Sequence, residues 1–187
     1  MNRLLIIIFI FFTQPVKLQA KNVYDEIQGK SYHPIIPGIV KNYISDLREY
    51  STLFDTIYSE FNGKRYLRYT HDYGTFQSSA YYREDNGSVI YIKSEKEKET
   101  IEIPNNPKIG MIWYEGDSTW KYTITSINEI LETPSSTYLN CLVIQSENLD
   151  LKKNPNKFQV YMQYYQRGRG FIGTKLGGLI YSYLIEE

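Results

Sequence analysis

Hydrophobic and polar residues alternate with a period of two along most of the chain, most clearly in 157–165 and 179–185. Successive side chains of a β-strand point to opposite faces, so this alternation predicts half-buried strands. In 157–165 the two faces would be Phe158, Val160, Met162 and Tyr164, and Gln159, Tyr161, Gln163 and Tyr165. Apolar or β-branched runs of strand length at 121–127 and 141–146 extend the pattern.

Turn signals separate these runs. Asn-Gly, Gly-Gly and Pro-containing clusters recur at 62–63, 85–87, 105–107, 134–136, 154–156 and 177–178. Asn-Gly between strand-like runs is a strong signal for a hairpin. The charged run 95–99 lies between two further strand-like segments and is typical of a solvated hairpin tip. The sequence therefore predicts an all-β fold: an antiparallel meander forming a half-barrel or sandwich, with at most one helix near the N-terminus.

The stretch 40–61 is ambiguous. Its apolar residues follow the i, i+3, i+4 spacing of an amphipathic helix, and Asn62-Gly63 would end that helix. The alternative is a strand from about Asp55 to Phe61, a turn at Asn62-Gly63 and a strand from Lys64 to Thr70. Helix and strand propensities do not decide between the two.

The first twenty residues have the pattern of a secretory signal peptide. Arg3 supplies the positive charge, nine apolar residues follow from Leu4 to Phe12, and Ala20 offers a cleavage position. Nine apolar residues are too few for a membrane-spanning helix, which needs about 20. We therefore expect a signal peptide at 1–20, a single β-rich domain at 21–187 with no membrane span, and export to the periplasm or the exterior of a bacterial cell.

Composition narrows the function. Lys plus Arg and Asp plus Glu both number 21, so no excess of basic residues indicates nucleic-acid binding. The 19 tyrosines are unusual, and they favour half-buried strands before they favour a ligand platform. Cys141 is the single cysteine; it lies in an apolar run and is predicted to be a buried, structural residue.

The sequence contains no recognisable catalytic or metal-binding pattern. His33 and His71 are far apart in sequence, and His71-Asp72 would point to opposite faces of a strand. The adjacent carboxylates Glu84-Asp85 and Glu186-Glu187 lie in turn-like or terminal contexts. We therefore expect no catalytic residue, no metal and no enzyme activity, although two carboxylates facing each other across a cleft would change this view.

Gly168, Gly170 and Gly173 have the spacing G-x-G-x-x-G, which in dinucleotide-binding proteins joins a strand to a long helix. Only fourteen residues follow Gly173, and they contain Gly177-Gly178 and an alternating strand rather than a helix. Gly168, Gly170 and Gly173 are therefore interpreted as structural turn residues, and no cofactor is expected.

The same segment, YYQRGRGFIGTK, resembles the closing segment of a group of uncharacterised exported β-rich proteins and lipoproteins of Bacteroidetes-type bacteria. Two further stretches, 124–144 and 106–113, resemble other elements of that group. The matching positions are Tyr164, Tyr165, Gly168, Gly170, Phe171 and Ile172, with Thr133, Pro134, Tyr138, Cys141, Gly110 and Trp113. Gly173 departs from the pattern, because a basic residue is usual there.

The resemblance covers most of 32–187 and implies an antiparallel all-β domain. It favours the strand alternative within 40–61 and implies no activity. At the level of fold, such domains also look like the periplasmic half-barrels that carry lipoproteins.

These observations lead to two expectations of function. The first is a non-catalytic envelope protein that binds an apolar small molecule or a partner protein. The second is a secreted protein that binds or cleaves glycans. Trp113, Tyr114 and Trp120 are the candidate ligand contacts, although core packing is the commoner role of such residues.

Overall fold

The computed structural model describes residues 31–46, 48–150 and 160–185. Regular structure in these ranges consists of β-strands, and no helix occurs among them. The strands are β1 (Val40–Ser45), β2 (Arg48–Phe61), β3 (Lys64–Asp72), β4 (Gln77–Asp85), β5 (Ser88–Ile92), β6 (Thr100–Ile103), β7 (Ile112–Tyr114), β8 (Trp120–Glu132), β9 (Thr137–Asn148), β10 (Val160–Gln166), β11 (Gly170–Leu176) and β12 (Leu179–Leu184). The predicted signal peptide lies outside the described residues.

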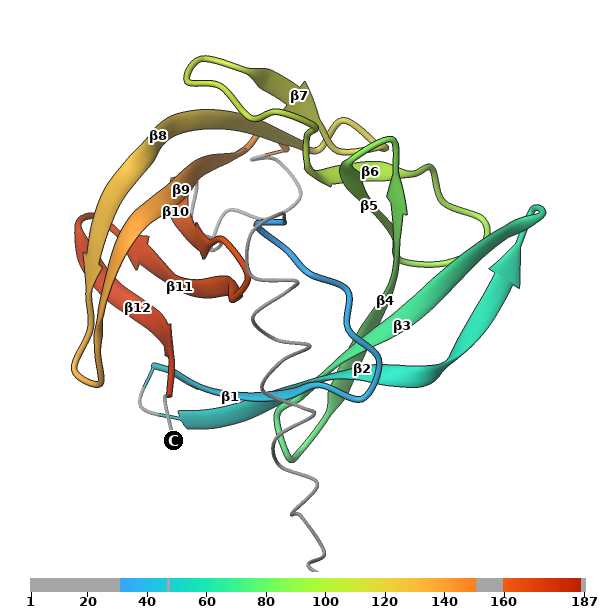
Figure 1. Ribbon diagram of the computed structural model, residues 1–187, viewed down its shortest axis with the longest axis horizontal. Helices are drawn as coiled ribbons and strands as arrows, with labels where there is room; N and C mark the ends of the chain where they lie inside the picture. Colours follow the sequence, from blue (N-terminus) through green and yellow to red (C-terminus); the bar gives the residue numbers. More distant parts are fainter. Residues whose placement is uncertain (1–30, 47, 151–159, 186–187) are drawn as a thin grey trace, which may run out of the picture.

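The strands form one antiparallel sheet that curls into a nearly closed barrel (Figure 1). Consecutive strands are neighbours throughout, except that β6 and β7 are the two edges of the sheet. The first and last strands pair instead, with Tyr43 opposite Leu184. The predicted antiparallel all-β fold is confirmed. The sheet curls further than a half-barrel and forms a nearly closed ring. The gap in the ring therefore falls in the middle of the chain.

Residues 40–61 form two strands, so the helix alternative is wrong. β1 and β2 pair from Val40 opposite Leu53 to Ser45 opposite Arg48. The spacing that resembled a helix instead places Tyr43 beside Tyr50, with ring centroids 5.1 Å apart, while Phe54 packs on Tyr69 of β3 at 4.4 Å. These cross-strand contacts come from tertiary pairing, which overrides local periodicity.

The predicted Asn-Gly hairpins are present. Asn62-Gly63 joins β2 to β3, and Asn86-Gly87 joins β4 to β5. Both residues of each pair have positive φ, 52° and 71° in the first turn and 49° and 81° in the second. Two consecutive left-handed residues form the type I′ turn, whose twist matches that of the flanking strands.

Two hydrophobic clusters stabilise the ring. The larger cluster is inside the barrel and includes Tyr32, Phe54, Tyr82, Ile144 and Tyr165. The second cluster joins the outer part of the β8–β9 hairpin to β1 and β10–β12; its members are Tyr43, Leu131, Tyr138, Cys141, Val143, Tyr164, Ile172 and Leu184. Cys141 is fully buried there, and burial raises its pKa to about 11, as expected of an unreactive structural cysteine.

Side chains close the gap between the edge strands. The Trp113 indole Nε1–H of β7 donates to the Ile101 carbonyl of β6 at 2.7 Å. The Gly116 amide donates to the Thr100 hydroxyl at 2.8 Å. These two bonds replace a backbone ladder between β6 and β7 and hold the edges together.

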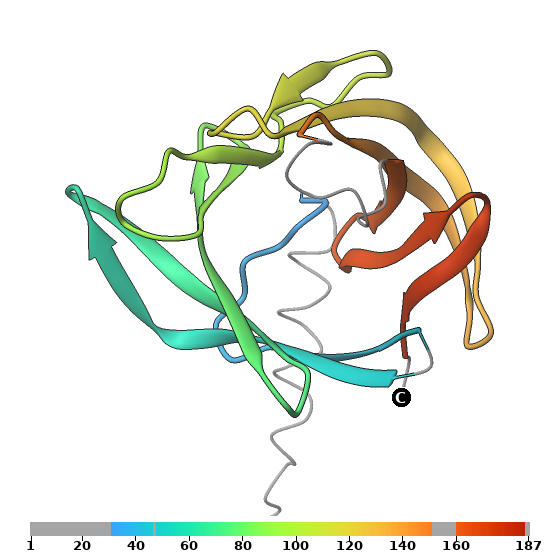
Figure 2. The ribbon, with the colours of Figure 1, turned by 180° about the vertical axis from the view of Figure 1, so that it is seen from behind.

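The segment 31–39 runs inside the ring of strands before β1 begins, as both views show (Figures 1 and 2). Tyr32 and His33 of this segment are buried. The Gly168 amide donates to the Ser31 carbonyl at 2.8 Å, which ties the segment to the β10–β11 turn. In the part of the chain that the structure describes, no helix is long and apolar enough to cross a membrane.

Candidate functional site

The ring of strands borders a cavity of about 570 Å³ that is partly open to solvent. Because side chains of a strand alternate between faces, every second residue of the surrounding strands lines it. The main lining positions are Tyr69 and His71 of β3, Ser78, Ala80 and Tyr82 of β4, Tyr91 of β5, Lys93 directly after β5, Tyr122 of β8, and Tyr161, Gln163 and Tyr165 of β10. One of the two faces predicted for β10, the face with Tyr161, Gln163 and Tyr165, thus lines the cavity.

Aromatic rings dominate the wall. Tyr82 stacks on Tyr91 with ring centroids 5.6 Å apart, and Tyr91 reaches Tyr122 through their hydroxyls at 3.5 Å. Burial raises the pKa of each of these tyrosines, and it raises the pKa of Tyr161 to about 12. The phenol groups therefore stay protonated at neutral pH and can donate hydrogen bonds into the cavity.

Glu115 is a buried carboxylate at the wall, with 6 % of its surface exposed. Its Oε1 accepts from the Tyr91 hydroxyl at 3.1 Å and pairs with the Lys93 ammonium, and its Oε2 accepts from Thr119 at 3.0 Å. The ion pair offsets the cost of burying the charge. Glu115 is thus held in place by donors on both oxygens.

Glu102 of β6 faces the same cavity. Its Oε1 accepts from the Tyr165 hydroxyl at 2.6 Å across the barrel. Burial raises the pKa of Glu102, the Tyr165 hydrogen bond lowers it, and the nearby Glu115 raises it further. The balance favours a protonated carboxyl more than in an exposed glutamate. The two carboxylates of the cavity therefore differ: one is ion-paired, and the other is biased towards its neutral form.

The two histidines, distant in sequence, also meet at the cavity. His33 stacks on Tyr82 at 5.0 Å, and both His33 and His71 pack edge-on against Tyr69, at 5.9 and 4.9 Å. Burial lowers the pKa of His33 to about 3 and of His71 to about 4, so both are neutral at pH 7. Both ring nitrogens of His33 and Nδ1 of His71 are buried without a hydrogen-bond partner in the described residues.

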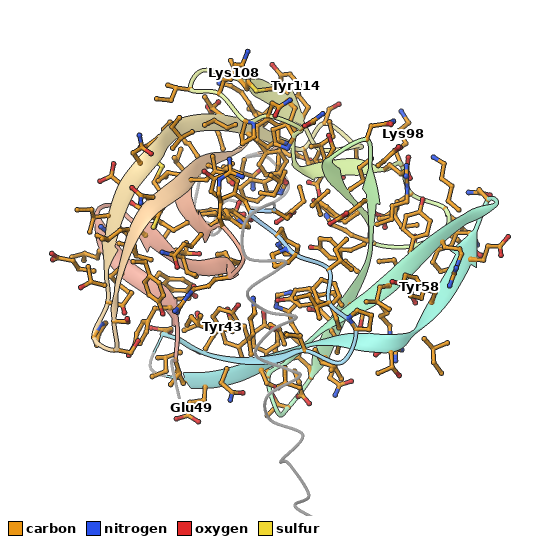
Figure 3. All side chains as sticks on the ribbon, in the orientation of Figure 1. Tyr43, Glu49, Tyr58, Lys98, Lys108 and Tyr114 are labelled. Carbon is orange, nitrogen blue, oxygen red and sulfur yellow. The ribbon has the colours of Figure 1, made fainter. Side chains whose placement is uncertain are left out.

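The residues nominated as ligand contacts are in different places. Trp120, at the start of β8, lines the cavity and packs on Tyr161 at 5.4 Å. Trp113 bonds across the gap between the edge strands and stacks on Tyr122 at 5.6 Å. Tyr114 is 53 % exposed and lies on the outside of β7 (Figure 3). Only Trp120 of the three borders the cavity.

The glycines of the G-x-G-x-x-G segment are turn and strand residues. Gly168 and Gly170 have φ of 72° and 81° at the β10–β11 turn. Gly173 is in β11, where a Cβ would lie 2.6 Å from the Ser182 carbonyl oxygen of β12. That carbonyl leaves no room for a side chain, which accounts for the third glycine.

Sequence reasoning did not single out Glu102, Glu115 or Lys93. The signal for Glu102 is its position between Ile101 and Ile103 in a strand-like run, where a charged residue is unusual. Glu115 carried no such signal, because it follows β7 in a turn-like context. In the described ranges no group of three or more His, Cys, Asp or Glu residues could hold a metal ion.

No family model, characterised protein or solved structure matches this chain.

Proposed function

We propose that the protein is a non-catalytic binding protein whose barrel holds a small molecule, or a side chain of a partner protein, in its interior cavity. The pattern of residues 1–20 supports a place of action in the bacterial periplasm or outside the cell. The observation that carries the proposal is the unfilled volume of about 570 Å³ inside a nearly closed ring of strands. Ligand pockets of proteins have volumes of about 300–1,000 Å³.

The polar groups of the cavity wall indicate the chemical class of the ligand. Aromatic rings provide broad apolar surface, and His33 and His71, which border the same space, have buried ring nitrogens without a partner in the described residues. A buried polar group without a partner is costly, and a ligand that supplies a hydrogen bond removes that cost. The favoured ligand is therefore mainly apolar, with one or two hydrogen-bonding groups.

Both carboxylates of the cavity are already hydrogen-bonded within the protein, which favours a binding function over a catalytic one. Glu115 is bonded through both oxygens, and Glu102 is bonded to Tyr165. A catalytic acid or base must instead reach a proton of the substrate.

The test uses N-phenylnaphthylamine, an uncharged probe whose fluorescence rises in apolar surroundings. We expect the wild-type protein to enhance its fluorescence with a micromolar Kd. Ala80→Phe adds a ring to the cavity wall and should weaken binding by about tenfold, which corresponds to about 1.4 kcal/mol. Val160→Phe adds the same ring at a position 42 % exposed on β10, and it should bind like the wild type.

Equal binding by all three proteins, or no enhancement by the wild type, would contradict the proposal. Native mass spectrometry of the protein purified from its own cells complements this test. A co-purifying small molecule would support the cavity as its carrier site, whereas a co-purifying protein would favour the partner version.

A second candidate function is cleavage of glycans, favoured by the presence of two unlike carboxylates on one cavity beside Trp120. Glu102, with its raised pKa, would be the proton donor, and ion-paired Glu115 the base or nucleophile. Glycosidases use such a division of roles. Release of reducing ends from envelope polysaccharides by the wild type, lost in both Glu102→Gln and Glu115→Gln, would establish this function.

A further inference from the structure

A second pocket, of about 320 Å³, lies where the inner segment 31–39 meets β1 and the β10–β11 turn. The apolar part of its wall consists mainly of Ile36, Ile39, Phe54, Phe171, Leu184 and Ile185. His33 and Tyr69 border both this pocket and the interior cavity. The two spaces are thus neighbours.

The pocket contains a lysine whose ammonium group has fewer acceptors than it can bind. The Lys41 ammonium of β1 donates to the Arg169 carbonyl oxygen. Among the described residues, no carboxylate lies within ion-pair distance of it. A half-buried ammonium with one carbonyl acceptor retains two donors for a further acceptor.

A second, independent observation concerns His33. It is 5 % exposed, borders the pocket, and has no partner for either ring nitrogen in the described part of the chain. A neutral imidazole has one donor and one acceptor. The pocket is thus bordered by an ammonium with donors to spare and by an imidazole whose nitrogens have no partner in the described residues.

We propose that this pocket binds the carboxylate of an apolar-tailed molecule, with Lys41 as the headgroup contact and the Ile and Phe side chains around the tail. Charge-assisted hydrogen bonds to a carboxylate are about twice as strong as neutral ones. The apolar wall adds favourable burial of the tail. The pocket shares His33, Tyr69 and Phe171 with the interior cavity, but Lys41 lines the pocket and not the cavity, so this proposal does not depend on the function proposed for the cavity.

Binding should weaken as pH rises above about 8. Burial, and next the charge of Arg169, lower the pKa of Lys41 to about 8. The other titratable groups bordering the pocket are His33 and Tyr69, whose pKa values of about 3 and about 12 keep both neutral across this range. The carboxylate ligand stays ionised throughout, so loss of the lysine charge removes the attraction.

The experiment is a calorimetric titration of the full chain with octanoate, octanol and acetate at about pH 7. We expect octanoate to bind at least tenfold more tightly than octanol, which lacks the charge, and than acetate, which lacks the tail. Lys41→Met should weaken octanoate binding by about ten- to a hundredfold and leave octanol binding unchanged. Lys108→Met removes an exposed lysine at the opposite side of the ring from Tyr43 and β1, and it should bind as the wild type does (Figure 3).

The comparison of ligands on the wild-type protein keeps the test valid even if Lys41→Met does not fold. Octanoate and octanol binding with equal affinity, or octanoate binding that is unchanged between about pH 7 and pH 10, overturns the carboxylate site. Binding of N-phenylnaphthylamine to the interior cavity is measured in a separate experiment, in which Ala80→Phe is the test variant. The failure of one proposal therefore does not imply the failure of the other.

Discussion

At the scale of single residues, the carboxyl group of Glu102 is the clearest case of a side chain whose chemistry is set by its surroundings. It is accommodated by one phenol hydrogen bond in an aromatic wall. Because burial raises its pKa, the folded protein holds this proton more tightly than the unfolded chain does. The resulting stabilisation is complete below the ordinary glutamate value of 4.5 and is lost as pH rises through the raised value.

Glu102→Gln should therefore stabilise the protein at neutral pH and have little effect at low pH. Glutamine keeps an oxygen that can accept from Tyr165 and carries no charge to desolvate. We expect Tm to rise by roughly 2–4 °C at about pH 7, equivalent to about 1 kcal/mol in a domain of this size, and to match the wild type at about pH 4. Glu84→Gln, at an exposed position, is the control and should show no such difference.

At the scale of elements, β11 and β12 approach so closely at Gly173 that position 173 has no room for a side chain. The constraint on this glycine is the short distance to β12 and not the conformation of a turn. A Cβ at Gly173 would lie 2.6 Å from the Ser182 carbonyl oxygen and 3.2 Å from the Leu131 side chain of the β8–β9 hairpin. The outer part of that hairpin is held to β12 by the Ser135 hydroxyl, which donates to the Leu184 carbonyl at 2.9 Å. A methyl group at position 173 would therefore disturb three strands together.

Gly173→Ala should lower the free energy of unfolding by about 1–3 kcal/mol, the usual cost of adding volume to a closely packed site. Gly63→Ala is a matched comparison, because its Cβ would meet nothing within 4 Å and only its φ of 71° is unfavourable. That conformational cost is about 1–2 kcal/mol. Urea unfolding of both variants measures the difference, and an unchanged midpoint for Gly173→Ala would refute the close approach.

At the scale of the whole molecule, the barrel is closed by pairing at one place and by side chains at another. The first and last strands, β1 and β12, pair through their backbones, whereas β6 and β7 are joined through the Trp113 and Thr100 side chains. The weakest point of the ring is therefore between the edge strands, next to Glu115 and the cavity.

Trp113→Phe keeps an aromatic ring beside Tyr122 and removes the indole donor. The expected loss of stability is about 0.5–1.5 kcal/mol, the net value of one hydrogen bond. Amide hydrogen exchange should accelerate in β6 and β7 and stay unchanged in β9 and β10. Uniform acceleration over all strands would show instead that the ring opens only by global unfolding.

Local patterns in the sequence determined the class of fold and several of its turns. Strand alternation and Asn-Gly turn chemistry act between near neighbours, so β10 and the hairpins at Asn62-Gly63 and Asn86-Gly87 could be predicted without tertiary contacts. The stretch 40–61 shows the limit of this reasoning. Its spacing fits a helix as well as a strand, and only pairing with β3 and β12 excluded the helix.

Only the tertiary structure decided where the chemistry lies. Glu102 and Tyr165 are 63 residues apart, and Lys41 and Arg169 are 128 apart, yet each pair is joined by a hydrogen bond. Such contacts depend on the closure of the ring and on the register of its strands, which no local pattern encodes. The sequence by itself determined that the chain forms strands. The curling of the sheet into a nearly closed ring decided which side chains face a cavity, because the two faces of a strand differ only once the sheet is curved.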